Sequence, residues 1–318
     1  MSGRGIRGDV TIIDYLIKFY RKNETFRSYS EDAVRTPRGN DAARAKCGAG
    51  VATRMTERVG PVTLDVTELD RMATFYEDVV GLRTLDRTEG RAVLGVDDAL
   101  LILRETPDRS ARGPAEAGLF HTAFRVPSRA ALGDALARIE SQWQLTGASD
   151  HGVSEALYLQ DPEDNGVEVY RDRPREDWPD ADGRVDMFTR RLALAPLRDG
   201  ASGEARCPSG TAVGHVHLEV SSLDDSVAFY GDGLGLDIRQ SMDGALFLAF
   251  DGYHHHVGLN TWNERSRPAA GRGLARIQLR VDDPADVRRR LDPSRLTERD
   301  DGFDAVDPDG ITVQIRRA

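Results

Sequence analysis

An internal repeat constrains the fold of this chain more than any other feature of its sequence. The segment LDVTELDRMATFYEDVVGL (64–82) recurs as LEVSSLDDSVAFYGDGLGL (218–236), at an offset of 154 residues and with nine identical positions. Each copy starts with the alternating apolar residues typical of a strand, followed by a turn and by apolar residues at helical spacing. A duplicated unit of this kind predicts a fold assembled from internal copies.

A second, weaker repeat lies between these copies and after them. GLFHTAFRVPSRAALGDAL (118–136) pairs with GLARIQLRVDDPADVRRRL (273–291), and DPEDNGVEVYR (161–171) pairs with DPDGITVQIRR (307–317). Together the two repeats predict four βαβββ units, at roughly 59–105, 118–171, 213–262 and 273–317. We therefore expect an α+β fold in which the units form two cup-shaped domains of curved sheet.

The predicted domain boundaries follow from the stretch between the second and third units, which is rich in Asp, Arg, Pro and Gly. We expect a first domain at 55–172, a linker at 173–212 and a second domain at 213–318.

The first 54 residues differ in composition from the rest. They contain all three lysines of the chain and carry a net charge of +5, whereas the remainder has no lysine and a net charge of −15. We predict that 1–54 is an N-terminal extension, either disordered or a wrongly assigned start. The alternative is an N-terminal helix around IIDYLIKFY (12–20).

Overall composition limits the classes of partner and compartment. The formal net charge of −10 argues against a nucleic acid or an anionic membrane as partner, and no apolar run is long enough to span a membrane. Cys47 and Cys207 are far apart, so we expect a reducing, cytoplasmic compartment. The excess of carboxylates and the use of arginine in place of lysine are typical of a salt-adapted, halophilic protein.

The repeat units resemble those of a known superfamily. Four βαβββ units, the FY…GL pattern after the first helix and the DPEDNGVEVY ending are similar to the vicinal oxygen chelate superfamily, which includes glyoxalase I and the extradiol catechol dioxygenases. The stretches HTAFRVPSRAAL, VGHVHLEV and GYHHHVGLN are most similar to two-domain bacterial catechol 2,3-dioxygenase-like proteins, over about 55–318.

This resemblance implies where a metal would bind, because the superfamily places ligands on the first and last strands of its units. The equivalent positions in the outer two units are Pro61, Ile102, Arg276 and Gln314. In the inner two units they are His121, Glu168, His215 and His256. We therefore predict that His121, His215 and Glu168 bind a non-haem Fe(II), with Mn(II), Ni(II) or Zn(II) as alternatives.

Strand alternation predicts the orientation of the run of three histidines. If Val257 and Leu259 occupy the apolar face, His254 and His256 face the metal cavity and His255 points away from it.

The resemblance also implies roles for further residues. His256 is expected to act as a catalytic acid or base, together with Tyr158, which lies ten positions before Glu168. Expected substrate contacts are His217, His151 in the HGVS stretch, and His254.

The ligand set makes a prediction about architecture. His121 and Glu168 belong to the second unit and His215 to the third, so these two units must share one sheet if all three residues bind one ion. Either the second unit pairs with the third and the first with the fourth within one chain, or two subunits of a homo-oligomer exchange halves. We favour the first arrangement.

The expected function is therefore Fe(II)-dependent extradiol ring cleavage of a small aromatic diol by O₂. One alternative is a glyoxalase I-like metal-dependent lyase or isomerase, which needs a fourth protein ligand. The other is a non-catalytic, ligand-binding member of the superfamily. The sequence does not name the substrate.

Overall fold

The computed structural model describes residues 58–181 and 184–318, and the predictions made for residues 1–54 lie outside this range. The first unit consists of β1 (Val62–Val66), α2 (Leu69–Phe75), η1 (Tyr76–Val80), β2 (Arg83–Thr88), β3 (Arg91–Gly95) and β4 (Ala99–Glu105). The second consists of β5 (Gly118–Arg125), α3 (Arg129–Gln142), β6 (Gly147–Asp150), β7 (Ser154–Gln160) and β8 (Gly166–Asp172). Both follow the predicted order of one strand, one helical segment and three strands.

The second half of the chain repeats this order. The third unit consists of β12 (Ala212–Glu219), α5 (Leu223–Val227), η3 (Ala228–Gly233), β13 (Asp237–Met242), β14 (Ala245–Ala249) and β15 (Val257–Asn260). The fourth consists of β16 (Gly273–Val281), α6 (Pro284–Arg290), η4 (Pro293–Arg295), β17 (Leu296–Arg299), β18 (Gly302–Val306) and β19 (Thr312–Arg317). Between the halves lie η2 (Arg175–Asp177), β9 (Asp180–Ala181), β10 (Arg184–Val185), β11 (Arg190–Arg191) and α4 (Ala195–Asp199).

The units pair across the two halves of the chain. The second and third units form one sheet in the order β11-β6-β7-β8-β5-β12-β15-β14-β13, here called the inner sheet. The first and fourth units form the outer sheet, in the order β17-β18-β19-β16-β1-β4-β3-β2. This confirms the predicted fold class and the favoured pairing of the inner units within one chain. The division into domains at 55–172 and 213–318 stays a prediction about the halves of the sequence.

Local signals in the sequence explain how the units start and end their helices. Ser128 and Ser222 are helix N-caps, and their hydroxyl oxygens accept hydrogen bonds from the backbone N–H groups of Ala131 and Asp225. The repeated glycine of the FY…GL pattern has a left-handed backbone in the first copy, where Gly81 has a φ of 98° and caps η1.

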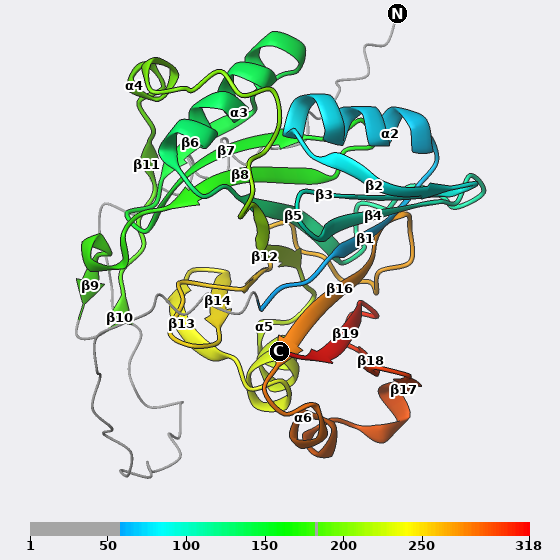
Figure 1. Cartoon of the computed structure of the whole chain (residues 1–318). Coiled ribbons are helices and arrows are strands. Elements are labelled where there is room, and N and C mark those ends of the chain that lie inside the picture. The colour runs from blue at the N-terminus through cyan, green and yellow to red at the C-terminus, as the bar shows by residue number, and fades with distance from the viewer. Residues whose placement is uncertain (1–57, 182–183) are drawn as a thin grey trace, which may run out of the picture. The chain divides into compact units, whose positions relative to one another are not determined.

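Each sheet buries one face against helices and keeps its other face polar. Helices α2 and α3 lie side by side on one side of the molecule, and α5 and α6 lie on the other (Figure 1). In β16, Ile277, Leu279 and Val281 are buried in the core, while the alternating Gln278 and Arg280 are half-exposed. The face opposite the core is therefore where chemistry can be placed, and in the inner sheet it carries the predicted ligands.

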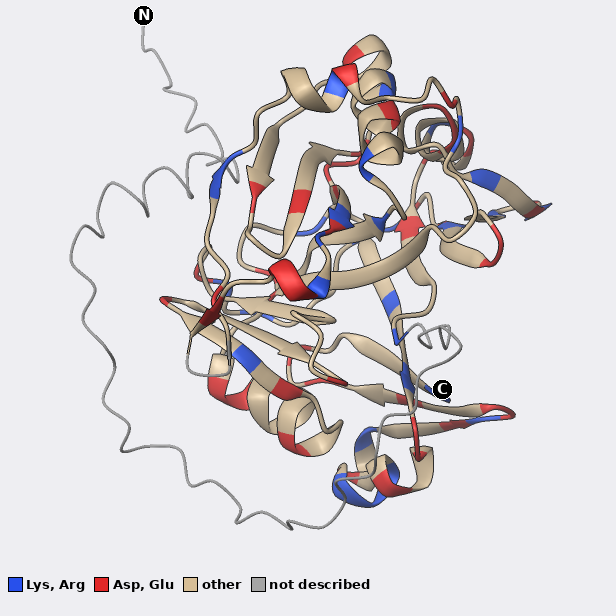
Figure 2. Cartoon of the chain, turned by 60° about the vertical axis from the view of Figure 1, so that its left-hand side comes forward, with Lys and Arg blue, Asp and Glu red and all other residues tan. Residues whose placement is uncertain are grey.

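Charged residues are spread over the described part of the chain, with acidic and basic side chains interspersed on helices, strands and loops (Figure 2). None of the helices in residues 58–181 and 184–318 is long and apolar enough to cross a membrane.

Candidate metal centre

Three side chains converge at the middle of the inner sheet. His121 comes from β5, Glu168 from β8 and His215 from β12, and these three strands are neighbours. His121 Nε2 lies 3.0 Å from Glu168 Oε2, His215 Nε2 lies 3.3 Å from the same oxygen, and the two nitrogens are 3.3 Å apart. Among the described residues, they form the one cluster of His, Cys, Asp or Glu that could hold a metal ion.

These distances fit a shared cation. Two donor atoms about 2.1 Å from one ion, at an angle of about 90° to 110°, lie about 3.0 to 3.4 Å apart. The two imidazole nitrogens and the carboxylate oxygen all offer lone pairs to the same point, and a cation placed there satisfies all three. The three donor atoms, all from one chain, are therefore spaced as the ligands of a single metal ion would be.

Electrostatics keep two of the three candidate ligands, His215 and Glu168, in the forms that bind metals. All three are buried. Burial lowers the pKa of His215 to about 4 despite the opposing charge of Glu168, so this imidazole is neutral near pH 7. Burial alone would raise the pKa of Glu168, but the neighbouring imidazoles of His215 and His121, which hydrogen-bond to it, hold this pKa well below its usual value. A neutral imidazole and an ionised carboxylate are the metal-binding states.

The position related to Glu168 by the repeat is a glycine. Glu168 lies opposite Ala123 in the β5–β8 pair, and Gly258 lies opposite His217 in the β12–β15 pair. Because Ala123 and His217 each follow a candidate histidine ligand by two residues, Gly258 occupies the place that a fourth ligand would take. A Cβ atom at Gly258 would lie 2.9 Å from the His217 ring, so the packing of this ring requires glycine here.

Tyr158 and His151 form a hydrogen-bonded pair beside the cluster. His151 Nε2 lies 2.7 Å from the Tyr158 hydroxyl, and His151 Nδ1 lies 3.1 Å from both the Phe188 carbonyl and Thr189 Oγ1. The Tyr158 ring centroid lies 5.9 Å from that of His121. Tyr158 thus lies next to the candidate ligands, and His151 lies directly behind Tyr158.

His217 lies in an aromatic enclosure on another side of the cluster. Its ring centroid is 5.1 Å from that of His121, 5.1 Å from Phe120, 5.4 Å from Trp262 and 5.7 Å from Phe247. Its Nε2 is buried and has no hydrogen-bond partner among the described residues. The sequence predicted a substrate contact at His217 but gave no signal for the three rings around it.

The predicted orientation of the three histidines is wrong. Strand β15 begins at Val257, and the backbone of His256 still bonds to Leu248 and Val216 of the neighbouring strands. The side chains of His254, His255 and His256 nevertheless do not follow the predicted alternation. The ring of His255 lies against the ligand His215, with centroids 4.1 Å apart. His256 instead stacks on Tyr253 at 4.8 Å, and its Nδ1 accepts a hydrogen bond from the Phe250 N–H. His255 is therefore the histidine of this run whose ring lies against His215, one of the candidate ligands.

His254 lies behind His255, and both of its ring nitrogens have protein partners. Its Nε2 lies 2.9 Å from Asp172 Oδ1 and its Nδ1 lies 2.8 Å from His255 Nδ1. His254 is fully buried, which does not suit the substrate contact expected for it. Sequence reasoning missed Asp172, although Glu168, Tyr170 and Asp172 alternate along β8 and so share one face.

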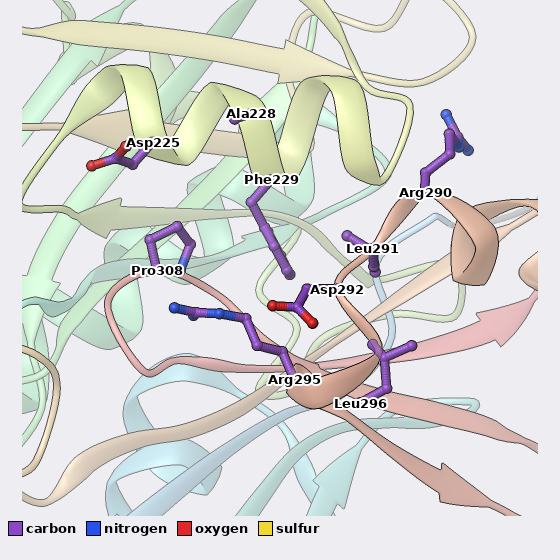
Figure 3. Close-up of a pocket in the computed structure, with 9 residues that line it drawn as sticks. All are labelled: Asp225, Ala228, Phe229, Arg290, Leu291, Asp292, Arg295, Leu296 and Pro308. Atoms are coloured by element: carbon purple, nitrogen blue, oxygen red, sulfur yellow. The ribbon is translucent and has the colours of Figure 1, made fainter.

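A surface groove of about 530 Å³ lies away from this site, between η3 and the segment after α6 (Figure 3). Phe229 and Leu291 lie in it. In the first half of the chain the equivalent Phe75 packs against Trp143, at a centroid distance of 5.0 Å. Helix α6 has 7 residues against 14 in α3, so the groove follows from a shorter helix.

Comparisons with known proteins bear on the family and the fold of this chain. Residues 58–169 and 212–315 match the model of the glyoxalase/bleomycin resistance protein/dioxygenase superfamily. A catechol-2,3-dioxygenase of Bacillus subtilis is 42% identical over 223 residues, which cover 66% of this chain and 76% of that protein. A 3-methylcatechol 2,3-dioxygenase of Pseudomonas putida is 25% identical over 214 residues, covering 63% of this chain and 66% of that protein.

Solved structures with the same fold have low sequence identity to this chain. Glyoxalase I from Zea mays superposes with a TM-score of 0.53 at 16% identity, covering 82% of this chain and 92% of that one. A putative dioxygenase from Bacillus subtilis gives a TM-score of 0.55 at 14% identity, covering 83% and 86%. These likenesses confirm the fold and carry no information about the reaction.

Proposed function

The chain belongs to the glyoxalase/bleomycin resistance protein/dioxygenase superfamily, and we propose that its reaction is the Fe(II)-dependent extradiol cleavage of an aromatic diol by O₂. It is a catechol 2,3-dioxygenase-like oxidoreductase. The proposal adds the metal, the class of substrate and the role of each side chain.

One observation carries the proposal: the inner sheet presents three ligands and a glycine at the fourth position. Two histidines and one carboxylate on one side of an ion leave its other positions open, which is the arrangement of non-haem Fe(II) oxygenases. Gly258 offers no donor atom at the position that the repeat relates to Glu168. The open positions give room for the two oxygens of a diol and for O₂.

His121, Glu168 and His215 would hold the ion. When bound, Fe(II) would orient the diol and supply the redox chemistry that allows O₂ to react with the ring. The chain would supply the enclosure, the orientation of the substrate and the handling of its protons.

The side chains around the ligands suit an aromatic substrate. Phe120, Phe247 and Trp262 surround His217 and would enclose an aromatic ring, while the unpartnered His217 Nε2 can bond a polar substituent. The Tyr158 hydroxyl, held by His151, would orient the substrate. His255, in contact with His215, takes the acid–base role that the sequence suggested for His256.

A glyoxalase-type reaction is less well supported by the site. The fourth protein ligand that this reaction needs would be His256, beside His121, Glu168 and His215. The His256 Nδ1 instead accepts a hydrogen bond from the Phe250 N–H, and its ring stacks on Tyr253. A binding role without a metal does not explain why three buried donor atoms converge on one point.

The test is turnover of catechol and 3-methylcatechol by protein purified without air and loaded with Fe(II). On admission of air we expect a yellow ring-fission product, formed in proportion to bound iron and absent from Zn(II)-loaded protein. Fully iron-loaded protein that consumes none of these diols, or Ni(II)- or Zn(II)-loaded protein that isomerises a hemithioacetal, would contradict the proposal.

A further inference from the structure

Two segments of the chain run between the inner and outer sheets and bond to each other. Residues 106–117 lead from β4 of the outer sheet to β5 of the inner sheet, and residues 261–272 lead from β15 of the inner sheet to β16 of the outer sheet. The backbone N–H groups of Ser266 and Arg267 donate to the Ala115 carbonyl at 2.9 Å and 3.0 Å. We call these two segments the crossing segments.

A buried carboxylate at the end of β12 holds both crossing segments. Glu219 lies opposite Gly118, the first residue of β5, and opposite Asn260, the last residue of β15. From the first crossing segment, Arg112 Nη2 lies 2.7 Å from Glu219 Oε2, and from the second, Arg265 Nη2 lies 3.0 Å from both carboxylate oxygens. Because a buried carboxylate needs charged or hydrogen-bonding partners, Glu219 fixes both segments where they join the inner sheet.

The turn that follows β15, residues 261–265, carries Trp262 and is bonded to Glu219 at two places. The side-chain amide of Asn263, the residue after Trp262, donates to Glu219 Oε1. Together with the arginine contact described above, this bond brackets Glu264, which has a left-handed backbone with a φ of 51°. A residue with a Cβ atom rarely adopts this conformation, and it persists only where the surroundings hold it. The bonds to Glu219 supply that hold.

Trp262 forms part of the apolar wall of the site. Its ring centroid lies 5.4 Å from that of His217 and 5.6 Å from that of Phe120. It also packs on a small apolar cluster, separate from the main core, that includes Phe247. Its Nε1–H donates to the Asp243 carbonyl at 3.2 Å. A shift of the turn therefore moves a ring that borders the site.

We infer that Glu219 is a positioning residue that holds Trp262 in the wall of the site, and that Trp262 determines which ring substituents the site accepts. The inference rests on the proposed function, in which this wall encloses the ring of a diol. In the described part of the chain, the side chain of Glu219 bonds to the crossing segments and not to the candidate ligands. Its loss should therefore change substrate binding and leave metal content as it is.

The repeat supplies a matched control in the outer sheet. Asp65 aligns with Glu219, and each is only 1% exposed. The carboxylate of Asp65 pairs with Arg104 and Arg109, neither of which lies in the turn that carries Trp262. A variant of Asp65 thus removes an equally buried ion pair without acting on the wall of the site.

Kinetics of iron-loaded protein test the positioning role. Glu219→Gln should raise the KM for catechol by about 10- to 100-fold, the cost of a misplaced binding group, with metal content unchanged. Asp65→Asn should keep the wild-type KM. In Trp262→Ala protein, Glu219→Gln should alter KM by at most about 2-fold, because its effect passes through that ring. Effects that multiply, or equal increases in Glu219→Gln and Asp65→Asn, would overturn the inference.

A milder variant covers the case in which Glu219→Gln does not fold. Asn263→Ala removes the contact next to Trp262 and leaves both arginines on Glu219. We expect KM to rise by about 2- to 10-fold, the change that corresponds to one hydrogen bond. A wild-type KM in folded Asn263→Ala protein would also overturn the inference.

The specificity role has its own measurement. A ring that is removed or displaced from the wall leaves room for a substituent. In Trp262→Ala and Glu219→Gln, kcat/KM for 3-methylcatechol or 4-methylcatechol, relative to catechol, should therefore rise by about 10-fold, the scale of one methyl group in an apolar pocket. Asp65→Asn should keep the wild-type ratios. Unchanged ratios for both methylcatechols in Trp262→Ala would contradict the specificity role.

Fluorescence separates the inference from the proposed function, because it needs no substrate. Trp262 is one of three tryptophans and the remaining one in Trp143→Phe, Trp178→Phe protein. We expect its emission to move to longer wavelength in Glu219→Gln, as the ring leaves its apolar contacts, and to stay unchanged in Asp65→Asn. A shift in protein that cleaves no diol keeps the positioning of Trp262 and refutes the function, and with it the specificity role. Turnover of catechol with unshifted emission in Glu219→Gln refutes the inference and keeps the function.

Discussion

The inner and outer sheets are built from the same repeat, yet only one carries a candidate metal centre. Both place a first strand beside the last strand of its unit, and both keep their polar face opposite the helices. At the position of His121 the outer sheet has Arg276, and at the position of Glu168 it has Gln314. Neither replacement binds divalent metals well, since the guanidinium offers no lone pair and the amide carries no charge.

The outer sheet uses these positions for an ion pair instead. Asp304 lies opposite Gln314 as Tyr158 lies opposite Glu168 in the inner sheet, so Asp304 occupies the place of the tyrosine. Arg276 Nη2 lies 3.3 Å from Asp304 Oδ2, and Arg299 Nε donates to the same oxygen at 2.9 Å. The comparison teaches that the fold sets where side chains meet, and that the residues at a few positions set what they do.

The largest difference between the sheets should appear when equivalent first-strand residues are replaced. His215→Ala removes a candidate ligand, so we expect loss of bound metal and a fall in turnover of more than about 100-fold, since changes to residues behind the ligands already cost about 10- to 100-fold. Pro61→Ala, at the equivalent position of the outer sheet, should change neither. Metal analysis and initial rates check both variants. Similar metal loss in the two would remove the distinction between the sheets.

The next effect separates neighbouring histidines. His255→Gln should lower kcat by about 10² to 10⁴-fold, the range for loss of a general acid or base, because its ring contacts His215. His256→Gln should have a small effect, because that ring stacks on Tyr253. Steady-state kinetics on iron-loaded proteins measure both. A larger loss in His256→Gln would restore the orientation predicted from strand alternation.

Glycine at the fourth position gives a gain-of-ligand test. Gly258→Glu should place a carboxylate near the open positions of the ion and displace the His217 ring, so we expect about a 10-fold to 100-fold loss of turnover with metal retained. Ile102→Glu is the matched control, because Ile102 lies opposite Thr63 as Gly258 lies opposite His217. Thermal unfolding of both variants separates local crowding from loss of the fold. Full activity in Gly258→Glu would show that this position does not face the ion.

The smallest effect concerns two buried carboxyl groups, one next to each sheet, that each accept a hydrogen bond from a tyrosine. Tyr76 donates to Asp161 at 2.9 Å and Tyr230 donates to Asp307 at 3.0 Å. Burial raises the pKa of Asp161 to about 6 and that of Asp307 to about 7. Because the folded state holds these protons more tightly, their stabilising contribution is complete below about pH 4 and is lost as the pH rises through the folded pKa.

The pH range over which the unfolding free energy depends on each carboxyl therefore differs between Asp161 and Asp307. Asp307→Asn should remove a decrease of the unfolding free energy with pH that extends up to about pH 7, and Asp161→Asn one that extends only up to about pH 6. Each carboxyl contributes a slope of at most about 1.4 kcal/mol per pH unit. Denaturant titrations at a series of pH values measure this. Wild type and Asp307→Asn curves that run parallel between pH 6 and 7 would contradict the raised pKa.

The repeat predicted the four units, because strand and helix periodicity is visible in each copy. The resemblance to a known superfamily supplied His121, Glu168 and His215, and the pairing of the inner units followed from the need for these residues to meet. The sequence could not predict the conformation of residues 253–256, because the strand starts at Val257 and the residues before it are arranged by ring stacking and by the hydrogen bond to Asp172. The role of Gly258 was also missed. The strand register makes Ile102 and Gly258 equivalent. The repeat offset of 154 residues instead aligns Ile102 with His256, two residues before Gly258.

The most direct test is a crystal structure of anaerobically purified, iron-loaded protein, with anomalous diffraction measured at the iron edge. The account predicts one anomalous peak per chain, bonded to His121, Glu168 and His215, with Arg276 and Asp304 still paired in the outer sheet. A peak in the outer sheet, two peaks per chain, or folded protein with no peak between the three inner residues would contradict it.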